Sequence, residues 1–132
     1  MSTLTQEGRF IGIKTPLGQD ALLLLSVEGQ EAFSELGYLR LEMIAERTDI
    51  QAKEIVGQRV DVWVQRSNGE KRHYNGFVNR FTAGGRHDSG HRRFTAQVVP
   101  WLWFLTLTSD CRIFQNKSVP QIIEAVFKDL GF

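Results

Sequence analysis

The segment between Val60 and Phe81 carries the feature that most restricts the fold, because two strand patterns flank a turn signal. Valine recurs at alternate positions from 60 to 64, which places its side chains on one face of an extended strand. Asn68 and Gly69 then favour the positive φ angles of a tight hairpin turn. The chain returns as a second strand over Arg72–Phe81. The sequence therefore predicts an antiparallel hairpin at its centre.

Further strand patterns lie on both sides of this hairpin. Each is a short apolar or alternating segment bounded by turn residues. The segment Thr82–Gly90 contains three glycines and is expected to be a loop. The other expected strands are Arg9–Lys14, Ala21–Val27, Tyr38–Glu46 and Arg93–Pro100, with the last continuing through WLWFLTL. Five or six closely spaced strands predict a mainly β fold, a small β-barrel.

Two helices are expected. Thr48 and Gln51 fit a capping box, which predicts one or two helical turns that end at Gly57. At the C-terminus, Ser118 and Gln121 form a second capping box and open a helix over about residues 118–130. Its apolar stripe is Val119, Ile122, Ile123, Val126, Phe127 and Leu130. We expect this amphipathic helix to pack on the barrel, with a neighbouring domain or subunit as the alternative.

Length and charge limit the class of protein. The chain has 132 residues, of which 42% are hydrophobic, which is enough for one core, so we expect a single domain over 1–132. A net charge of +1 gives no general attraction to nucleic acid or to a membrane surface. The first ten residues lack the pattern of a signal peptide, which predicts a cytoplasmic protein. Cys111 is the only cysteine and is expected to be a small packed hydrophobe.

The search for a reactive site yields weak candidates. His87 and His91 are four residues apart, but they lie among glycines, where this spacing does not indicate a metal site. A hydrolase that uses them with a metal is one alternative, and a barrel that binds a small ligand against Trp101 or Trp103 is another. We expect no catalytic, cofactor or metal site, and the sequence predicts that the chain is not an enzyme.

A resemblance extends over nearly the whole chain. The most distinctive segments are PWLWFL, SDCRIFQN and SVPQII, in the region from Pro100 to Ile123. YNGFVNRF at Tyr74–Phe81 and the opening segment TPLGQDALLLLSVEGQEAFSELGYLRLEM match as well. The sequence resembles the VgrG family, the spike proteins of type VI secretion systems, which are similar to the hub proteins of contractile phage tails.

This resemblance implies a structural role in assembly. VgrG proteins are similar to trimeric hubs that adapt the hexameric tube protein, Hcp, to a cell-puncturing needle. The implied partners are other subunits of the same kind, Hcp and baseplate proteins, with no nucleic acid and no direct membrane binding. The implied location is the cytoplasm during assembly and then delivery with the spike. This chain matches only the first hub barrel and the following helix, so we expect an N-terminal fragment of a longer protein, with a truncated homologue as the alternative.

The residues expected to matter for assembly are structural. Asp110 and Arg112 are expected to fix the loop before the helix by charge-assisted hydrogen bonds, with Ile113 and Phe114 anchoring that loop in the core. The apolar residues expected to contribute are Trp101, Trp103, Phe104, Ile122, Ile123, Val126 and Phe127. The basic residues expected to contact a neighbouring subunit from a loop tip are Arg86, Arg92 and Arg93.

Overall fold

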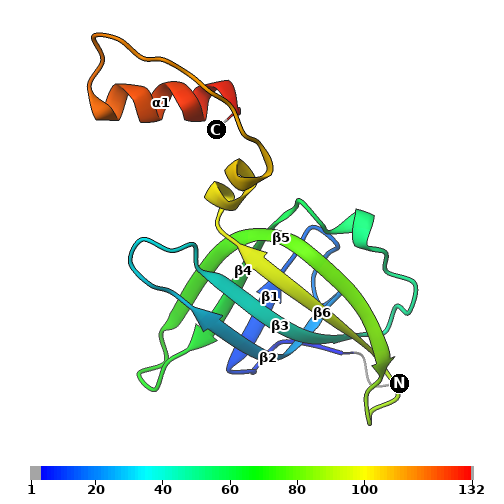
Figure 1. The fold of residues 1–132 in the computed structure, drawn as a ribbon. Helices are drawn as coiled ribbons and strands as arrows, with labels where there is room; N and C mark the ends of the chain where they lie inside the picture. Colours follow the sequence, from blue (N-terminus) through cyan, green and yellow to red (C-terminus); the bar gives the residue numbers. More distant parts are fainter. Residues whose placement is uncertain (1–3, 132) are drawn as a thin grey trace.

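The computed structural model describes residues 4–131, which form a nearly closed antiparallel barrel with a helix outside it (Figure 1). The two 3-10 helices are designated η. The elements in chain order are β1 (Ile11–Lys14), β2 (Leu23–Gln30), β3 (Tyr38–Ala45), η1 (Ala52–Glu54), β4 (Arg59–Gln65), β5 (Lys71–Arg86), β6 (Arg92–Val99), η2 (Trp101–Leu107) and α1 (Val119–Asp129). The predicted β-barrel with a C-terminal amphipathic helix is confirmed.

The six strands form one sheet in the order β1-β4-β5-β6-β3-β2, and every hydrogen-bonded pair is antiparallel. The two edge strands, β1 and β2, lie against each other and bring the sheet almost to closure. The side chain of Gln6 bonds to the free edge of β1, where it donates to the carbonyl of Ile13 (2.9 Å) and accepts from its N–H (2.6 Å). Arg9 donates to the carbonyl of Leu24 on β2 (3.0 Å) and so connects the segment before β1 with β2.

The core lies inside the barrel and follows the alternation seen in the sequence. Leu41, Met43 and Ala45 of β3 are fully buried, as predicted for one face of that strand. Phe94 of β6 is also fully buried, and its ring stacks on that of Phe81 with centroids 5.2 Å apart. Burying one such side chain stabilises the fold by about 1.5–3 kcal/mol before conformational entropy is considered.

The central hairpin forms as predicted between β4 and β5, although its turn differs in detail. The N–H of Arg66 donates to the carbonyl of Glu70 (2.7 Å), and the N–H of Gly69 donates to the carbonyl of Arg66 (2.9 Å). Gly69 has φ +85°, whereas Asn68 is not left-handed. The connection is therefore a three-residue loop that ends in a left-handed glycine, not a two-residue Asn-Gly turn.

The predicted loop at Thr82–Gly90 is wrong over its first half, because β5 continues through Arg86. Gly84 and Gly85 take ordinary extended angles, and the pairing with β6 shifts register between Ala83 and Arg86. Such a shift is typical of a β-bulge, which lets glycines remain within a strand. The β5–β6 connection is consequently a short hairpin tip.

The short helix after β3 is present, but its cap differs from the predicted one. The N–H of Gln51 donates to Glu54 Oε2 (2.7 Å), so the capping box lies three residues later than expected. Thr48 instead uses its carbonyl to accept from Arg92 Nη1 (2.9 Å). The hydrogen bond from the N–H of Gln51, followed by the hydrogen bond from Arg47, lowers the pKa of Glu54.

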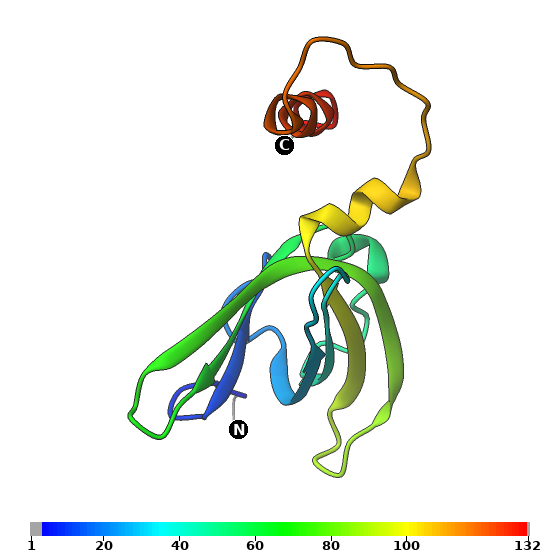
Figure 2. The same cartoon turned by 60° about the vertical axis from the view of Figure 1, so that its left-hand side comes forward.

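The terminal helix begins and ends as predicted but does not cover the barrel. Ser118 caps α1, Gln121 completes its capping box, and Gly131 follows it with φ +84°. Figures 1 and 2 show α1 separated from the strands, beyond the mouth of the barrel, and joined to them through residues 108–118. The expectation that its stripe packs on its own barrel is therefore wrong.

Candidate assembly site

The connection between barrel and helix is aromatic. The ring of Phe104 in η2 meets that of Phe77 in β5 edge to face, with centroids 5.7 Å apart. Trp103 contacts Phe104 in the same geometry (5.3 Å), and Trp101 contacts Phe127 of α1 (4.7 Å). These contacts connect β5 with α1 through η2, and each aromatic pair adds about 0.5–1.5 kcal/mol beyond its burial.

The prediction that β6 continues through WLWFLTL is wrong. Pro100 caps η2, and the N–H of Trp103 donates to the carbonyl of Pro100 (2.9 Å). An apolar segment of this length has no period that separates a strand from a helical turn, so the sequence did not decide between them. Trp101 and Trp103 consequently do not share one strand face.

Arg112 connects the loop to the helix. Its Nε donates to Asp110 Oδ2 (2.9 Å), so the two charged residues expected to fix this loop are bonded to each other. Its Nη1 also lies 2.5 Å from Asp129 Oδ2 at the end of α1, a contact that the sequence did not reveal. Hydrogen bonding to Arg112, and secondly to the N–H of Cys111, lowers the pKa of Asp110. The two carboxylates raise the pKa of the Arg112 guanidinium, with Asp110 contributing more.

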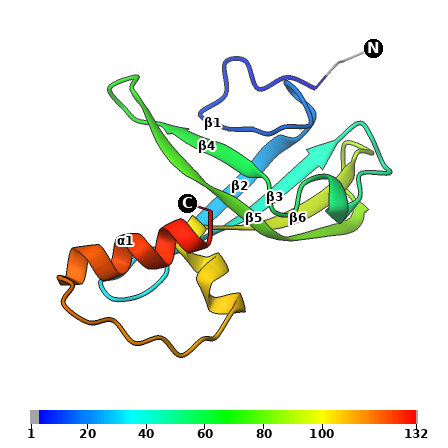
Figure 3. The ribbon, with the colours of Figure 1, turned by 90° about the horizontal axis from the view of Figure 1, so that it is seen from above.

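The apolar residues of the same loop do not reach the core. Ile113 is 89% exposed, and Phe114 is half-buried with the amino group of Lys117 5.6 Å from the centre of its ring. The prediction that these two residues anchor the loop in the core is therefore wrong, because the loop runs outside the barrel (Figure 3). Cys111 is likewise exposed, which corrects its interpretation as a packed residue.

The apolar stripe of α1 is largely accessible. Ile122, Val126 and Phe127 are half-buried, while Ile123 remains 44% exposed and Val119 69% exposed. No residue of α1 is buried. The helix thus presents an apolar face that the described part of the chain covers only in part.

The predicted basic tip is located at the β5–β6 hairpin. Arg86 and Arg92 are cross-strand neighbours, and Arg93 is exposed beside them. The Arg92 guanidinium already donates to the carbonyl of Thr48, so Arg86 and Arg93 have the more accessible guanidinium groups. Arg86 lies opposite Arg92 at this tip, and Arg93 follows Arg92 on β6.

The two histidines of this tip share one serine. Nδ1 of His87 and Nδ1 of His91 each lie 2.9 Å from Ser89 Oγ. Within residues 4–131, no group of three or more His, Cys, Asp or Glu residues is placed to hold a metal ion. In that same range, no helix is both long and apolar enough to cross a membrane.

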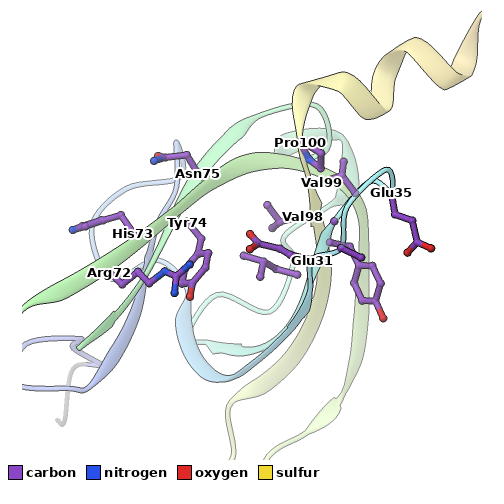
Figure 4. Close-up of a pocket in the computed structure, with 13 residues that line it drawn as sticks. Glu31, Glu35, Arg72, His73, Tyr74, Asn75, Val98, Val99 and Pro100 are labelled. Atoms are coloured by element: carbon purple, nitrogen blue, oxygen red, sulfur yellow. The ribbon is translucent and has the colours of Figure 1, made fainter. Parts of the chain in front are cut away.

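A groove lies at the mouth of the barrel that no motif in the sequence indicated. It has a volume of about 500 Å³ and lies between the β2–β3 loop, the start of β5 and the end of β6. A second hollow of about 410 Å³ adjoins it along β2, and the two share Glu31, Leu39, Arg72 and Tyr74. We call these two hollows together the mouth groove. Figure 4 shows Arg72 and Tyr74 on one side and Glu31 on the other.

The mouth groove could not be found from motifs, because it arises from unequal strand lengths. β1 has four residues and β2 has eight, so the seam between them widens beyond Ile11. Half-buried apolar residues line the opening, among them Val27, Val64 and Tyr74. Trp101 and Trp103, which the ligand-binding alternative requires, do not line it.

The barrel, its aromatic connection and the accessible helix together define a structural module of the phage tail hub type. Residues 30–132 match the model of the phage tail baseplate hub (GPD) family, which is more than half of the chain. The chain belongs to this family.

Relatives and a solved structure agree with this assignment. The chain is 39% identical over 132 residues to the type VI secretion system spike protein VgrG1b of Pseudomonas aeruginosa, and 38% identical over 127 residues to VgrG1a of the same species. These matches cover 98% and 94% of this chain but only 17% and 19% of those proteins. The chain thus spans about a fifth of the length of these relatives.

The fold is similar to that of the c3393 protein of E. coli, described as a type VI secretion component that resembles the T4 tail proteins gp27 and gp5. The TM-score is 0.75 with 21% sequence identity, over 90% of this chain and 32% of that one. This similarity supports the fold, and the sequence relatives support the family.

Proposed function

We propose that this chain is a structural component of a type VI secretion spike, in which its barrel forms part of the hub between the Hcp tube and the needle. The observation that carries this proposal is the match of residues 30–132 to the baseplate hub family. The spike proteins VgrG1b and VgrG1a, to which the chain is similar, support the secretion system as its context. In this role the segment performs no catalysis.

The proposed partners follow from the hub role. They are other subunits of the same kind, arranged as a trimer, together with Hcp and baseplate proteins. Nucleic acid and membrane are not among them. The protein would assemble in the cytoplasm and leave the cell with the spike. We treat the barrel, η2 and α1 as one module in this assembly.

The surfaces proposed for assembly are those that the fold leaves accessible. The apolar stripe of α1 is one, since Val119 and Ile123 are exposed beside the half-buried Phe127. The basic tip around Arg86 and Arg93 is the other, because its guanidinium groups face solvent. Apolar contacts contribute most to affinity, and charged rims contribute mainly to orientation and association rate.

Light scattering over a range of protein concentrations tests this proposal, with and without the Hcp ring. A trimer, or a complex with the ring, is expected for a hub component. A strict monomer that ignores the ring contradicts an assembly role for this chain. A variant with Arg86, Arg92 and Arg93 changed to alanine that assembles normally removes the basic tip from the proposal.

A further inference from the structure

We propose that the mouth groove receives the exposed segment Thr108–Lys117 of a second copy of this chain, which adds a strand to the free edge of β2. This inference rests on the proposed function, since it assumes that copies of the chain assemble with one another. It identifies the two surfaces that meet and the chemistry by which they recognise each other.

The groove offers a vacant strand position. β1 pairs with β4 over Ile11–Lys14 only, whereas β2 pairs with β3 as far as Gln30. In the described part of the chain, Val27–Gln30 therefore has a strand ladder on its β3 side alone. An edge of this kind presents unpaired N–H and C=O groups, which an extended segment can satisfy by β-strand addition.

The floor of the groove is apolar, and a glycine makes room for one of its side chains. A Cβ atom at Gly29 would lie 2.5 Å from Cδ2 of Leu39, so the missing side chain lets Leu39 approach the backbone of β2. Tyr74 and Val98 continue this floor. The groove thus fits an aliphatic side chain of an inserted strand, which would bury apolar area at about 25 cal/mol per Å².

The walls of the groove carry opposite charges. Glu31 lies on the β2–β3 loop, and Arg72 lies across from it on β5 (Figure 4). A strand that carries both an acidic and a basic side chain beside its apolar residue is therefore electrostatically complementary to the two walls. A uniformly acidic or uniformly basic strand would be repelled by one of them.

The segment Thr108–Lys117 has this chemistry. It contains no helix or strand, and Ile113 within it is 89% exposed. Asp110 and Arg112 precede this isoleucine, so both charge signs accompany the apolar residue. Ten residues span about 30 Å when extended, which exceeds the length needed to pair with the four residues of Val27–Gln30.

The occupant comes from a second copy because the segment is held away from its own groove. Phe104 fixes η2 on β5, and Trp101 holds α1 through Phe127. Arg112 ties the segment to Asp129 on α1, and Figure 3 shows the segment looping outside the barrel. A groove on one copy filled by a segment of the next is a head-to-tail contact, which generates a ring when the rotation closes.

Disulfide trapping tests this arrangement, because Cys111 is the only cysteine and is exposed two residues before Ile113. Acceptor variants combine Cys111→Ser with a cysteine in place of Glu31 or Arg72, one on each wall, so that either strand direction is sampled. Each acceptor is mixed with the unaltered chain under a buffer of reduced and oxidised glutathione, in which thiol–disulfide exchange forms the bond and releases reduced glutathione. The matched control acceptor carries Lys53→Cys on η1, outside the groove.

We expect a disulfide-linked pair with a groove acceptor and at least tenfold less with the Lys53→Cys control. Ile113→Asp in the donor should lower trapping about tenfold, which is the usual effect of losing one buried anchor. Leu107→Asp, at a residue that is 65% exposed but lies outside the segment, should leave trapping unchanged. Equal trapping by the control acceptor, or trapping insensitive to Ile113→Asp, would overturn the inference. So would a disulfide that forms within one chain when Cys111 and Glu31→Cys are both present.

Light scattering separates this inference from the proposed function. An oligomer that shows no trapping at either wall contradicts the groove contact and leaves the hub role standing. A chain that stays monomeric but binds the Hcp ring also contradicts the groove contact alone. A monomer that ignores the ring contradicts both.

Discussion

The indole ring of Trp101 meets the phenyl ring of Phe127 edge to face, with 4.7 Å between their centroids. This contact joins η2 to α1 across eleven residues without regular secondary structure, 108–118. No residue of α1 is buried, so the helix has no fully packed side chain that fixes its orientation. This ring pair and the bond from Arg112 to Asp129 are among the contacts that position α1.

Phe127→Ala should release the helix without affecting the barrel. Loss of the ring pair removes about 1 kcal/mol, which corresponds to roughly fivefold faster amide exchange across α1. Hydrogen exchange of α1 and of β3 measures both effects in one experiment. Ile123→Ala is the matched control, since this side chain is 44% exposed and should change exchange little. Equal acceleration in β3 would show that the ring pair supports the barrel as well.

Ser118→Ala should fray the same helix from its other end. Ser118 Oγ accepts from the N–H of Gln121, and Gln121 Oε1 accepts from the N–H of Ser118 (2.9 Å). Removal of such a cap costs about 1 kcal/mol of helix stability. Loss of helical circular dichroism with an unchanged urea midpoint for the barrel is the expected result. Ser118→Asp, which also caps, should restore the signal.

Local sequence patterns predicted most strands and the terminal helix correctly. They were wrong where tertiary packing, and not the local pattern, determines the secondary structure. The valines from 60 to 64 and the cap at Ser118 are local signals, and both elements form as predicted. The apolar run of η2 carries no such signal, so its expected strand was wrong. At the site, Asp110 and Arg112 were expected to form charge-assisted hydrogen bonds that fix the loop, and the bond between them joins residues only two apart. The second hydrogen bond of Arg112, to Asp129, depends on the tertiary position of α1, so the sequence could not reveal it.

Acid should loosen the ion pair between Asp110 and Arg112 in the loop before α1. The pKa of Asp110 is below its ordinary value of about 3.9, so its ion pair contributes fully above that pH. The contribution is lost as the pH falls through the lower pKa of the folded state. The side-chain Nε–H resonance of Arg112 should therefore shift toward its free position below about pH 3.9. Asp110→Asn should remove this pH response, and a response that persists would assign it to another group.

Gly12→Ala should destabilise the barrel more than a surface substitution. Trp63 lies directly over Gly12 on the neighbouring strand, so a Cβ at position 12 would collide with the indole atoms Cζ2 and Cε2. Lys71 Nζ lies 4.0 Å from the centre of the same ring and restricts how far the indole can move away from position 12. We expect a loss of about 1–3 kcal/mol, the usual cost of overpacking, measured by urea unfolding.

Gly85→Ala provides the matched control for this change. Gly85 also lies within a strand with ordinary angles, but no atom lies within 4 Å of the position its Cβ would take. Its substitution should be neutral or stabilise by up to about 1 kcal/mol, because alanine reduces the conformational freedom of the unfolded chain. Equal destabilisation by the two substitutions would show that the loss at Gly12 comes from its backbone. A loss at Gly12 alone, accompanied by a changed tryptophan emission, assigns the cost to displacement of the Trp63 ring.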